Sequence, residues 1–359
     1  MKLWLKALVL SIITGTLACT LTACAGSPIN KLVESVIDVK NEFNSIVIDT
    51  SMADISILPS EDGNCKVIAN DLKKIVYTAE VEGNTLKIKL NDQRKWYQKL
   101  FNWHTPTLTL YIPAKEYGAL NIDASTGNIR INHAFTFASV DIKISTGDVS
   151  LTGVNSLGGV NVELSTGDVL IDTVTCTDFT SSGSTGDINV SALSATGSVA
   201  ITRSSGNVYI KESTVGADLT AKTSTGNNDV AGVVCGGNFN HEVSTGRARV
   251  MSITCCDFTS YGDTGNLKLE NVIAGGKFDI KRSTGDVKFA ACDAAEIYVS
   301  VDTGNVTGTL RTSKIFIVKT STGNVEVPES VTGGKCKITT STGDVEIAIS
   351  DEPLINEEG

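Results

Sequence analysis

Apolar and polar residues alternate along most of this chain, in short runs on either side of a turn of the type Ser-Thr-Gly-Asp. From Val140 to Ile144 the apolar side chains fall at every second position, and the alternation resumes from Val149 to Leu151. A period of two is typical of strands with one buried face. Abundant β-branched residues and a regularly recurring glycine disfavour helices. The pattern therefore predicts an all-β protein.

The turn phrase recurs from residue 125 almost to the end of the chain, and consecutive turn glycines are separated by a nearly constant interval. A constant period of this kind indicates an array in which one supersecondary unit stacks on the next. The apolar columns keep their distance from each turn: Val140 and Val160 stand seven positions before a glycine, and Val149 and Val169 two positions after one. The turn glycines are Gly127, Gly147, Gly167, Gly186, Gly206, Gly226, Gly246, Gly265, Gly285, Gly304, Gly323 and Gly343.

A chain that returns to the same place once per repeat, with two inward-facing strands per circuit, forms a parallel β-solenoid. We predict this fold for residues 119–349, with the right-handed coiling that is usual for crossovers between parallel strands. A stack of antiparallel hairpins is the alternative, but the constant register of the columns favours the solenoid. Residues 41–118 hold further strand-like runs and a degenerate turn phrase at Thr50–Ile55. We expect this β-rich region to start or cap the array.

Aspartates that follow the turn glycines are the first candidates for chemistry. Asp148, Asp168 and Asp187 belong to three consecutive coils, which places their carboxylates about 5 Å apart. A glycoside hydrolase uses paired carboxylates, and calcium needs six to eight converging oxygens. Other coils carry Asn207 and Asn227 in the same column, and asparagine replaces aspartate as a hydrogen-bonding corner residue but not as an acid. We therefore interpret the column as structural and expect no catalytic residue, metal or cofactor.

The N-terminus has the features of a bacterial lipoprotein signal. Lys2 and Lys6 precede an apolar run over residues 7–18, and Leu21-Thr22-Ala23-Cys24 matches a lipobox. We expect residues 1–23 to be removed and Cys24 to carry the lipid, which anchors the protein to the cell membrane on its extracytoplasmic side. An ordinary secretory signal and a membrane span are the alternatives, although the run is short for a spanning helix of about 20 residues. Residues 24–40 are then a linker, and residues 350–359 an acidic tail.

The net charge and the cysteines restrict the partners and the cross-links. Loss of two lysines with the signal moves the formal charge from −10 to −12, which argues against nucleic acid as a partner. Seven cysteines follow Cys24, and Cys235 and Cys255 fall on adjacent coils, where a disulfide is geometrically possible. The corner column that they occupy holds small residues in other coils, so we favour buried thiols. His241 stands in an inward column, and we interpret it as buried rather than catalytic.

One segment, Arg94–His104, is basic and aromatic in an otherwise acidic chain with few aromatic residues. If it is exposed, its rings suit contact with a membrane interface, a glycan or a protein. The alternative is that it folds over the open end of the solenoid. Its candidate binding residues are Trp96, Tyr97, Phe101 and Trp103.

A divergent strand region, then Leu110-Tyr111-Ile112-Pro113, then serial Ser-Thr-Gly-Asp/Asn turns resembles the bacterial family of putative adhesins with β-strand repeats, a domain of unknown function. The resemblance covers roughly residues 41–349. It implies a β-strand repeat fold and an envelope location, and it brings no catalytic residues.

These observations favour a non-enzymatic, lipid-anchored surface protein whose rod displays a binding or adhesive face. The ligand is then a glycan, a wall polymer or another envelope protein, since long stacked surfaces suit extended ligands. An accessory or signalling lipoprotein with a membrane-protein partner is the alternative. A carbohydrate-active β-helix enzyme is the third, and it is disfavoured because no long loop interrupts the array to build a cleft.

Overall fold

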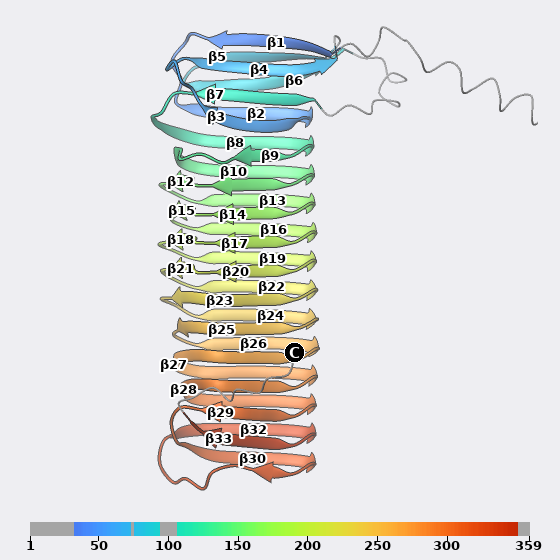
Figure 1. The fold of residues 1–359 in the computed structure, drawn as a ribbon, viewed down its shortest axis with the longest axis vertical. Coiled ribbons are helices and arrows are strands. Elements are labelled where there is room, and N and C mark those ends of the chain that lie inside the picture. Colours follow the sequence, from blue (N-terminus) through green and yellow to red (C-terminus); the bar gives the residue numbers. More distant parts are fainter. Residues whose placement is uncertain (1–31, 73–74, 94–105, 351–359) are drawn as a thin grey trace, which may run out of the picture.

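The protein is an all-β parallel solenoid. The computed structural model describes residues 32–72, 75–93 and 106–350, and these form a straight stack of coils in which every element is a strand (Figure 1). Successive coils pair in parallel, and equivalent residues of neighbouring coils lie side by side. Val140 pairs with Val160, and Val160 pairs with Phe179. The predicted parallel β-solenoid is confirmed, with a spacing of about 20 residues between turns.

Four coils carry a third, very short strand that the alternation did not predict. In one coil, β13 (Val160–Thr166) runs to the turn glycine, β14 (Val169–Asp172) leaves it, and β15 (Thr175–Cys176) lines the second corner. A two-residue strand shows no periodicity in a sequence, which explains why only two strands per coil were expected. The array continues through β10 (Thr136–Thr146), β11 (Val149–Thr152), β12 (Asn155–Ser156), β16 (Phe179–Thr185), β17 (Ile188–Ser191), β18 (Ser194–Ala195), β19 (Val199–Ser205), β20 (Val208–Lys211), β21 (Thr214–Val215), β22 (Leu219–Thr225), β23 (Asn228–Cys235), β24 (Phe239–Thr245), β25 (Ala248–Cys255), β26 (Phe258–Thr264) and β27 (Leu267–Thr284).

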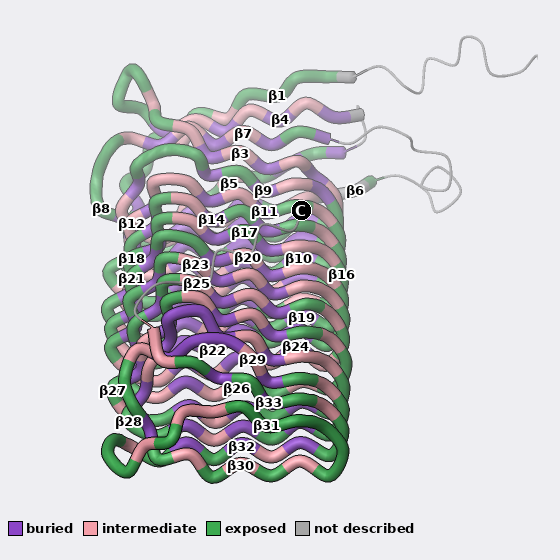
Figure 2. The backbone as a smooth tube through the Cα atoms, turned by 60° about the horizontal axis from the view of Figure 1, so that its bottom comes forward, coloured by how far each residue is buried: buried purple, intermediate pink, exposed green. Residues whose placement is uncertain are grey.

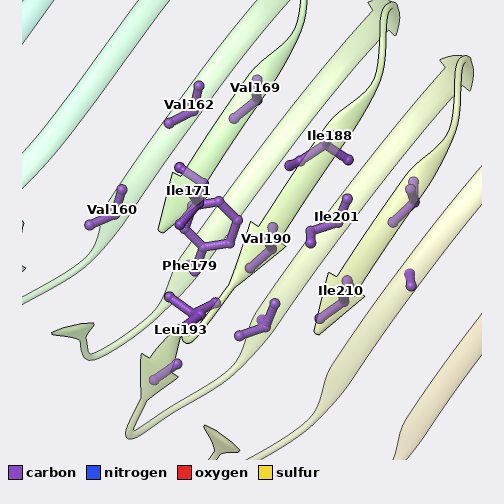
Figure 3. Close-up of a cluster of buried hydrophobic side chains, with 14 of the residues drawn as sticks. Val160, Val162, Val169, Ile171, Phe179, Ile188, Val190, Leu193, Ile201 and Ile210 are labelled. Carbon is purple, nitrogen blue, oxygen red and sulfur yellow. The ribbon is translucent and has the colours of Figure 1, made fainter. Parts of the chain in front are cut away.

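The core is a continuous apolar column inside the coils. Side chains of neighbouring coils stack directly. The ring centroid of Phe258 lies 5.4 Å from that of Phe239 and 5.5 Å from that of Phe278. Figure 3 shows a section of this column, in which Phe179 lies beside Ile171 and Val190. The buried residues alternate with intermediate and exposed ones along each coil (Figure 2). Each coil thus buries its apolar positions against the coils above and below it.

At the N-terminal end, the coil order in space differs from the order in sequence. β2 (Ser45–Met52) lies between β6 (Thr85–Asp92) and β8 (Glu116–Thr126). β3 (Asp54–Pro59) likewise lies between β7 (Thr107–Ile112) and β9 (Ile129–Ile131). The first coil of the solenoid therefore begins at Ser45, well before residue 119, because the degenerate turn at Thr50–Ile55 stacks on the turn of Gly127.

Three antiparallel strands cover this end. β4 (Cys65–Leu72) pairs with β7 and with β1 (Leu32–Val39), and β5 (Ile75–Glu82) pairs with β6. Residues 32–39 were expected in the linker of residues 24–40, and they form an edge strand instead. Their apolar residues do not alternate strictly, so the pattern gave no signal. An antiparallel cap of this kind closes the edge of the parallel stack.

The C-terminal end has a similar interlock. β32 (Gly334–Thr342) lies between β28 (Val287–Thr303) and β30 (Lys314–Thr322). β33 (Val345–Ile349) lies between β29 (Val306–Leu310) and β31 (Val325–Glu326). The last coil of the sequence is therefore the penultimate coil in space, and the coil of Gly323 is outermost. The coil of β2 and β3 at one end and the coil of β32 and β33 at the other are thus each held between two coils.

Candidate functional site

The turn glycines form a corner where backbone of one coil presses on backbone of the next. Their φ angles lie between +121° and +152°. A Cβ on Gly147 would lie 1.9 Å from the carbonyl oxygen of Gly127, and one on Gly226 would lie 2.0 Å from that of Gly206. A side chain is therefore excluded twice, by the positive φ and by the neighbouring carbonyl. Only glycine fits at this corner.

The acidic and amide residues after these glycines join the coils to one another. Asp168 N–H donates to Asp148 Oδ1 (2.9 Å), Asp187 N–H to Asp168 Oδ1 (2.8 Å) and Asn227 N–H to Asn207 Oδ1 (2.9 Å). Either residue type serves, because only one side-chain oxygen is needed. One oxygen of each of these carboxylates is thus held by a structural hydrogen bond. No group of three or more metal-ligating side chains comes together among the residues that the structure describes.

A second ladder at the opposite corner was not predicted from the sequence. Ser198 N–H donates to Asp178 Oδ1 (2.8 Å), and Lys277 N–H donates to Asp257 Oδ1 (2.8 Å). Between these two pairs, Asn238 N–H donates to Asp218 Oδ1 (2.7 Å). The available signal was an acidic or amide residue eight positions before several turn glycines. Both corners are therefore built from backbone and from short polar side chains.

The outer face beside the turn corner carries a groove, here called the corner groove, whose lining residues belong to five successive coils. It has a volume of about 440 Å³, and its lining includes Lys143, Glu163, Ser145, Ser165 and Ser184. The serines stand two positions before turn glycines and are exposed, and Lys143 Nζ lies 3.7 Å from Glu163 Oε2. The groove offers hydroxyl, carboxylate and ammonium groups in a regular array. Such groups bind polar ligands through hydrogen bonds.

A second depression, here called the Tyr261 pocket, lies in the same columns farther along the rod, on β26, β27 and β28. Its volume is about 450 Å³. It is lined by Tyr261, Gly262, Asp263, Lys281, Arg282, Ser283, Ser300 and Asp302. Lys281 Nζ lies 4.9 Å from the centroid of the Tyr261 ring and 3.8 Å from Asp279 Oδ1. The pocket therefore combines an aromatic ring with charged and hydroxyl groups.

Each depression lies at a glycine whose missing side chain makes room for a buried arginine of the next coil. Arg203 packs against Gly183, and its Nη2 donates to Ser181 Oγ (3.0 Å). Arg282 packs against Gly262 in the same way, and its Nη2 donates to Ser260 Oγ (2.9 Å). Burial lowers the pKa of each arginine to about 10, which leaves the guanidinium charged at neutral pH. This pairing was also missed in the sequence, where its signal is a glycine followed one coil later by an arginine.

His241 lies inside the core and faces the arginine network. It is 1% exposed, and its Nδ1 lies 3.0 Å from Ser260 Oγ. Burial, with a smaller contribution from the positive charge of Arg282, lowers the pKa of His241 to about 3. The imidazole is therefore neutral at physiological pH and inaccessible to a substrate.

The seven cysteines of the described residues are all free thiols. Six are buried, including Cys235 and Cys255, and Cys256 is exposed. Burial raises the pKa of Cys176, Cys255 and Cys336 to about 12, so these thiols stay protonated at neutral pH. Burial agrees with the interpretation of the cysteines as small core residues.

The candidate binding residues Trp96, Tyr97, Phe101 and Trp103 and the candidate lipidation site Cys24 lie outside the described residues. The strands around the aromatic segment still locate its attachment. It connects β6, which pairs with β2, to β7, which pairs with β3. The strands β2 and β3 are joined at Ala53, and next to this junction Asp54 N–H donates to Pro106 O (2.8 Å). The described strand ends on either side of the segment, Asp92 and Thr107, therefore lie at the turn corner of the capped end.

The chain matches the family described as Toastrack DUF4097 over residues 43–245 and 208–357. It belongs to the Toastrack family. The two overlapping matches together span the whole solenoid of this Toastrack protein, and the family is a domain of unknown function.

Several solved structures resemble the chain at low identity. A putative adhesin from Bacteroides fragilis NCTC 9343 is 15% identical, with 89% of this chain and 97% of that chain covered and a TM-score of 0.30. A putative cell adhesion protein from Clostridium sporogenes ATCC 15579 is 9% identical, with 89% and 100% covered and a TM-score of 0.22. A putative lipid binding protein from Parabacteroides distasonis ATCC 8503 is 13% identical, with 88% and 96% covered and a TM-score of 0.25.

Comparison with curated proteins gives no match. Within the described ranges of this Toastrack protein, no helix has the length and apolar character needed to cross a membrane.

Proposed function

We propose that this Toastrack protein is a lipid-anchored, extracytoplasmic, non-enzymatic binding protein. Its corner groove holds an extended polar ligand, such as a surface glycan, a wall polymer or an envelope protein. The observation that carries the proposal is the corner groove itself, with its repeated hydroxyl groups along the rod. In ten of the twelve repeats the residue two positions before the turn glycine is serine.

The spacing of these groups suits a ligand that is itself a repeating polymer. Coils of a parallel stack are about 4.8 Å apart, so a chain lying along the rod meets an equivalent serine at each step. The groove is open and shallow, and its charged residues Lys143 and Glu163 are about half exposed. Many weak contacts of this kind add up along an extended ligand, as on other solenoid surfaces.

The occupation of the turn carboxylates supports binding rather than catalysis. Asp148 and Asp168 accept backbone hydrogen bonds from the next coil, and His241 is enclosed in the core. A hydrolase needs an accessible acid and a second carboxylate or base across the scissile bond. The groove residues Asp123, Lys143 and Glu163 stand on an open strand face instead.

We include the membrane anchor in the proposal because the capped end of the rod is the end that follows Cys24 in the sequence. The first described strand, β1, lies at that end (Figure 1), and Cys24 precedes it by only a few residues. A lipid on Cys24 would hold the capped end near the membrane. The twelve repeats of about 4.8 Å would then carry the outermost coil roughly 50–60 Å away from it.

A second candidate function is an accessory lipoprotein that contacts a protein partner through its outer end. The outermost coil and the loop after it expose Ile315, Ile317, Val325 and Val331, and Val331 is 92% exposed. Exposed apolar side chains on a terminal coil favour a protein contact there. This contact would use the end of the rod and not its groove.

The test is retention of the full-length protein, in mild detergent, on immobilised cell-envelope material. We expect Lys143→Ala with Glu163→Ala to reduce retention several-fold. The matched control is Lys222→Ala with Glu242→Ala, which removes an equivalent exposed ion pair (3.1 Å) in the same columns but outside the groove. Equal retention of both variants and the wild-type protein would rule out the corner groove as the binding surface.

A further inference from the structure

The serine column beside the turn corner is interrupted twice, and both interruptions face one pocket. Asp263 and Asp302 replace serine two positions before Gly265 and Gly304, and they flank Ser283 on the coil between them. The register of Thr264, Thr284 and Thr303 places these coils next to one another. The two carboxylates therefore belong to coils about 10 Å apart. Both line the Tyr261 pocket.

The pocket also holds an exposed aromatic side chain. Tyr261 is 37% exposed, and every other Phe, Tyr or Trp side chain in the described part of the chain is less exposed. Its hydroxyl donates to Asp279 Oδ2 (3.3 Å), which fixes the outer edge of the ring. An aromatic ring fixed at its polar end provides an apolar surface at little entropic cost.

A buried arginine lies at the floor of the same pocket. Arg282 is 4% exposed, and its Nε has no hydrogen-bond partner among the residues described in the structure. Its Nη2 is held by Ser260 Oγ, which also lies 3.0 Å from His241 Nδ1. An unsatisfied buried donor is costly unless a ligand or water reaches it. Arg203 Nε beside the corner groove is in the same state, so the two depressions share a buried arginine with a donor that is unpaired within the described part of the chain.

We propose that the Tyr261 pocket binds a neutral hexose unit of a glycan that lies along the rod. The carboxylates of Asp263 and Asp302 accept hydrogen bonds from sugar hydroxyls, and the C–H face of the pyranose packs on the Tyr261 ring. Lys281, which lies over that ring in the free protein, moves aside toward Asp279. The proposal deepens the proposed function and rests on it, because it names the ligand class and a specific subsite.

The charges of the pocket select a neutral sugar. Two carboxylates, one ammonium group and one guanidinium group line it, so their formal charges cancel. A uronic-acid polymer would meet the carboxylates of Asp263 and Asp302, and a polycation would meet Lys281 and Arg282. A divalent cation lacks the six or more oxygen ligands that calcium needs. Hydroxyl groups satisfy both carboxylates without adding charge.

The experiment measures calorimetric binding of neutral hexasaccharides to the full-length protein in mild detergent. The probes are β-1,4-linked glucose and β-1,4-linked mannose hexasaccharides, with a galacturonic acid hexasaccharide as the charged comparison. Asp263→Ser with Asp302→Ser restores the residue found in the other coils. Because Asp263 also stabilises the charge of the buried Arg282, Asp302→Ser alone is measured beside it. Asp286→Asn is the matched control, since it alters a carboxylate of the same region within the structural ladder.

We expect a neutral hexasaccharide to bind the wild-type protein and the Asp286→Asn variant alike. Affinity should fall at least about tenfold in the double serine variant and in Tyr261→Ala, as loss of an interface hot spot predicts. It should also fall in Asp302→Ser, with an unchanged thermal melt. Equal affinity of the double variant, tighter binding of the uronic acid probe, or no binding of either neutral probe would overturn the proposal. A further outcome is that envelope material retains the protein, and that this retention is lost when the material is treated with protease but not when it is oxidised with periodate. The ligand would then be a protein, and the proposed function would remain intact.

Discussion

Replacement of Gly226 by alanine is the most direct test of why the turn phrase requires glycine. The φ of Gly226 is +144°, and a Cβ there would lie 2.0 Å from the carbonyl oxygen of Gly206 and 2.6 Å from its carbonyl carbon. Both obstacles are backbone atoms of the neighbouring coil, so neither moves unless the stack opens. A residue held in such a φ region costs about 1–3 kcal/mol. Overpacking adds about 1–3 kcal/mol.

A second glycine, with a smaller positive φ and open space around it, serves as the comparison. Gly153 also has a positive φ, +71°, but a Cβ there would meet its nearest atom at 3.7 Å, an ordinary contact. Gly153→Ala should therefore cost only the backbone part, about 1–2 kcal/mol. Gly226→Ala should cost about 2–6 kcal/mol in total, since both effects apply.

The measurement is denaturant unfolding followed by circular dichroism for the wild-type protein and both variants. Equal losses for the two glycine variants would show that the carbonyl contact contributes nothing, and our explanation of the repeat would be wrong. Asp168→Asn serves as a third variant and should change stability by less than about 0.5 kcal/mol, because asparagine keeps the accepting oxygen. A loss as large as that of Gly226→Ala would instead indicate a charge-dependent site.

Three further predictions concern the anchor, the thiols and the aromatic segment. Cys24→Ala should abolish lipid labelling, whereas Cys19→Ala, which changes the other cysteine near the signal, should leave it unchanged. Labelling that persists without Cys24 would refute the lipobox. A maleimide at pH 8 should modify the exposed Cys256 in the folded protein, and it should reach Cys176 only after unfolding. Burial raises the pKa of Cys176 to about 12, and its thiolate forms only near that pH. The modified sites are identified by mass spectrometry, and fast labelling of Cys176 in the folded protein would contradict its burial. Trp96→Ala with Trp103→Ala should weaken retention on envelope material with an unchanged melt if the segment binds, and should lower the melting temperature if it caps the rod.

The buried columns of the repeat were predictable because each coil places apolar residues at the same distances from its turn glycine. Val140, Val160 and Phe179 stand at equal distances from their glycines, and all three are buried in register. Burial of alternate positions is the strongest signal in a sequence of strands. The turn glycines are visible for the same reason, although the nearness of the Gly206 carbonyl to Gly226 is not.

The order of the terminal coils was not predictable from the sequence. Coils with the same turn phrase are interchangeable in a stack, so nothing near Gly323 or Gly343 indicates that the second lies inside the first. The interlock depends on contacts between distant strands, such as β28 with β32. The antiparallel strand β1 was missed because an edge strand with mixed exposure lacks a period.

Only part of the Tyr261 pocket could be predicted from the sequence. Asp263 and Asp302 each depart from the serine column, which a comparison of coils reveals, but their convergence on one pocket needs the register of three strands. Arg282 stands in the inward column of Phe278 and Ile280, and its long charged side chain fits there because Gly262 leaves room for the guanidinium group. Sequence reasoning assigns charged residues to the surface, and here packing against a glycine overrides that rule.

The central claim is that the rod binds an extended glycan without transforming it. One measurement tests this: end-labelled polysaccharide from envelope material is incubated with the immobilised full-length protein, eluted, and sized by chromatography. We predict that the polysaccharide is retained and recovered at its original chain length, and that retention falls in the variant with Asp263→Ser and Asp302→Ser. Shortened chains whose appearance depends on Asp263 would contradict the claim and indicate a hydrolase, and absence of retention would remove the glycan as the ligand.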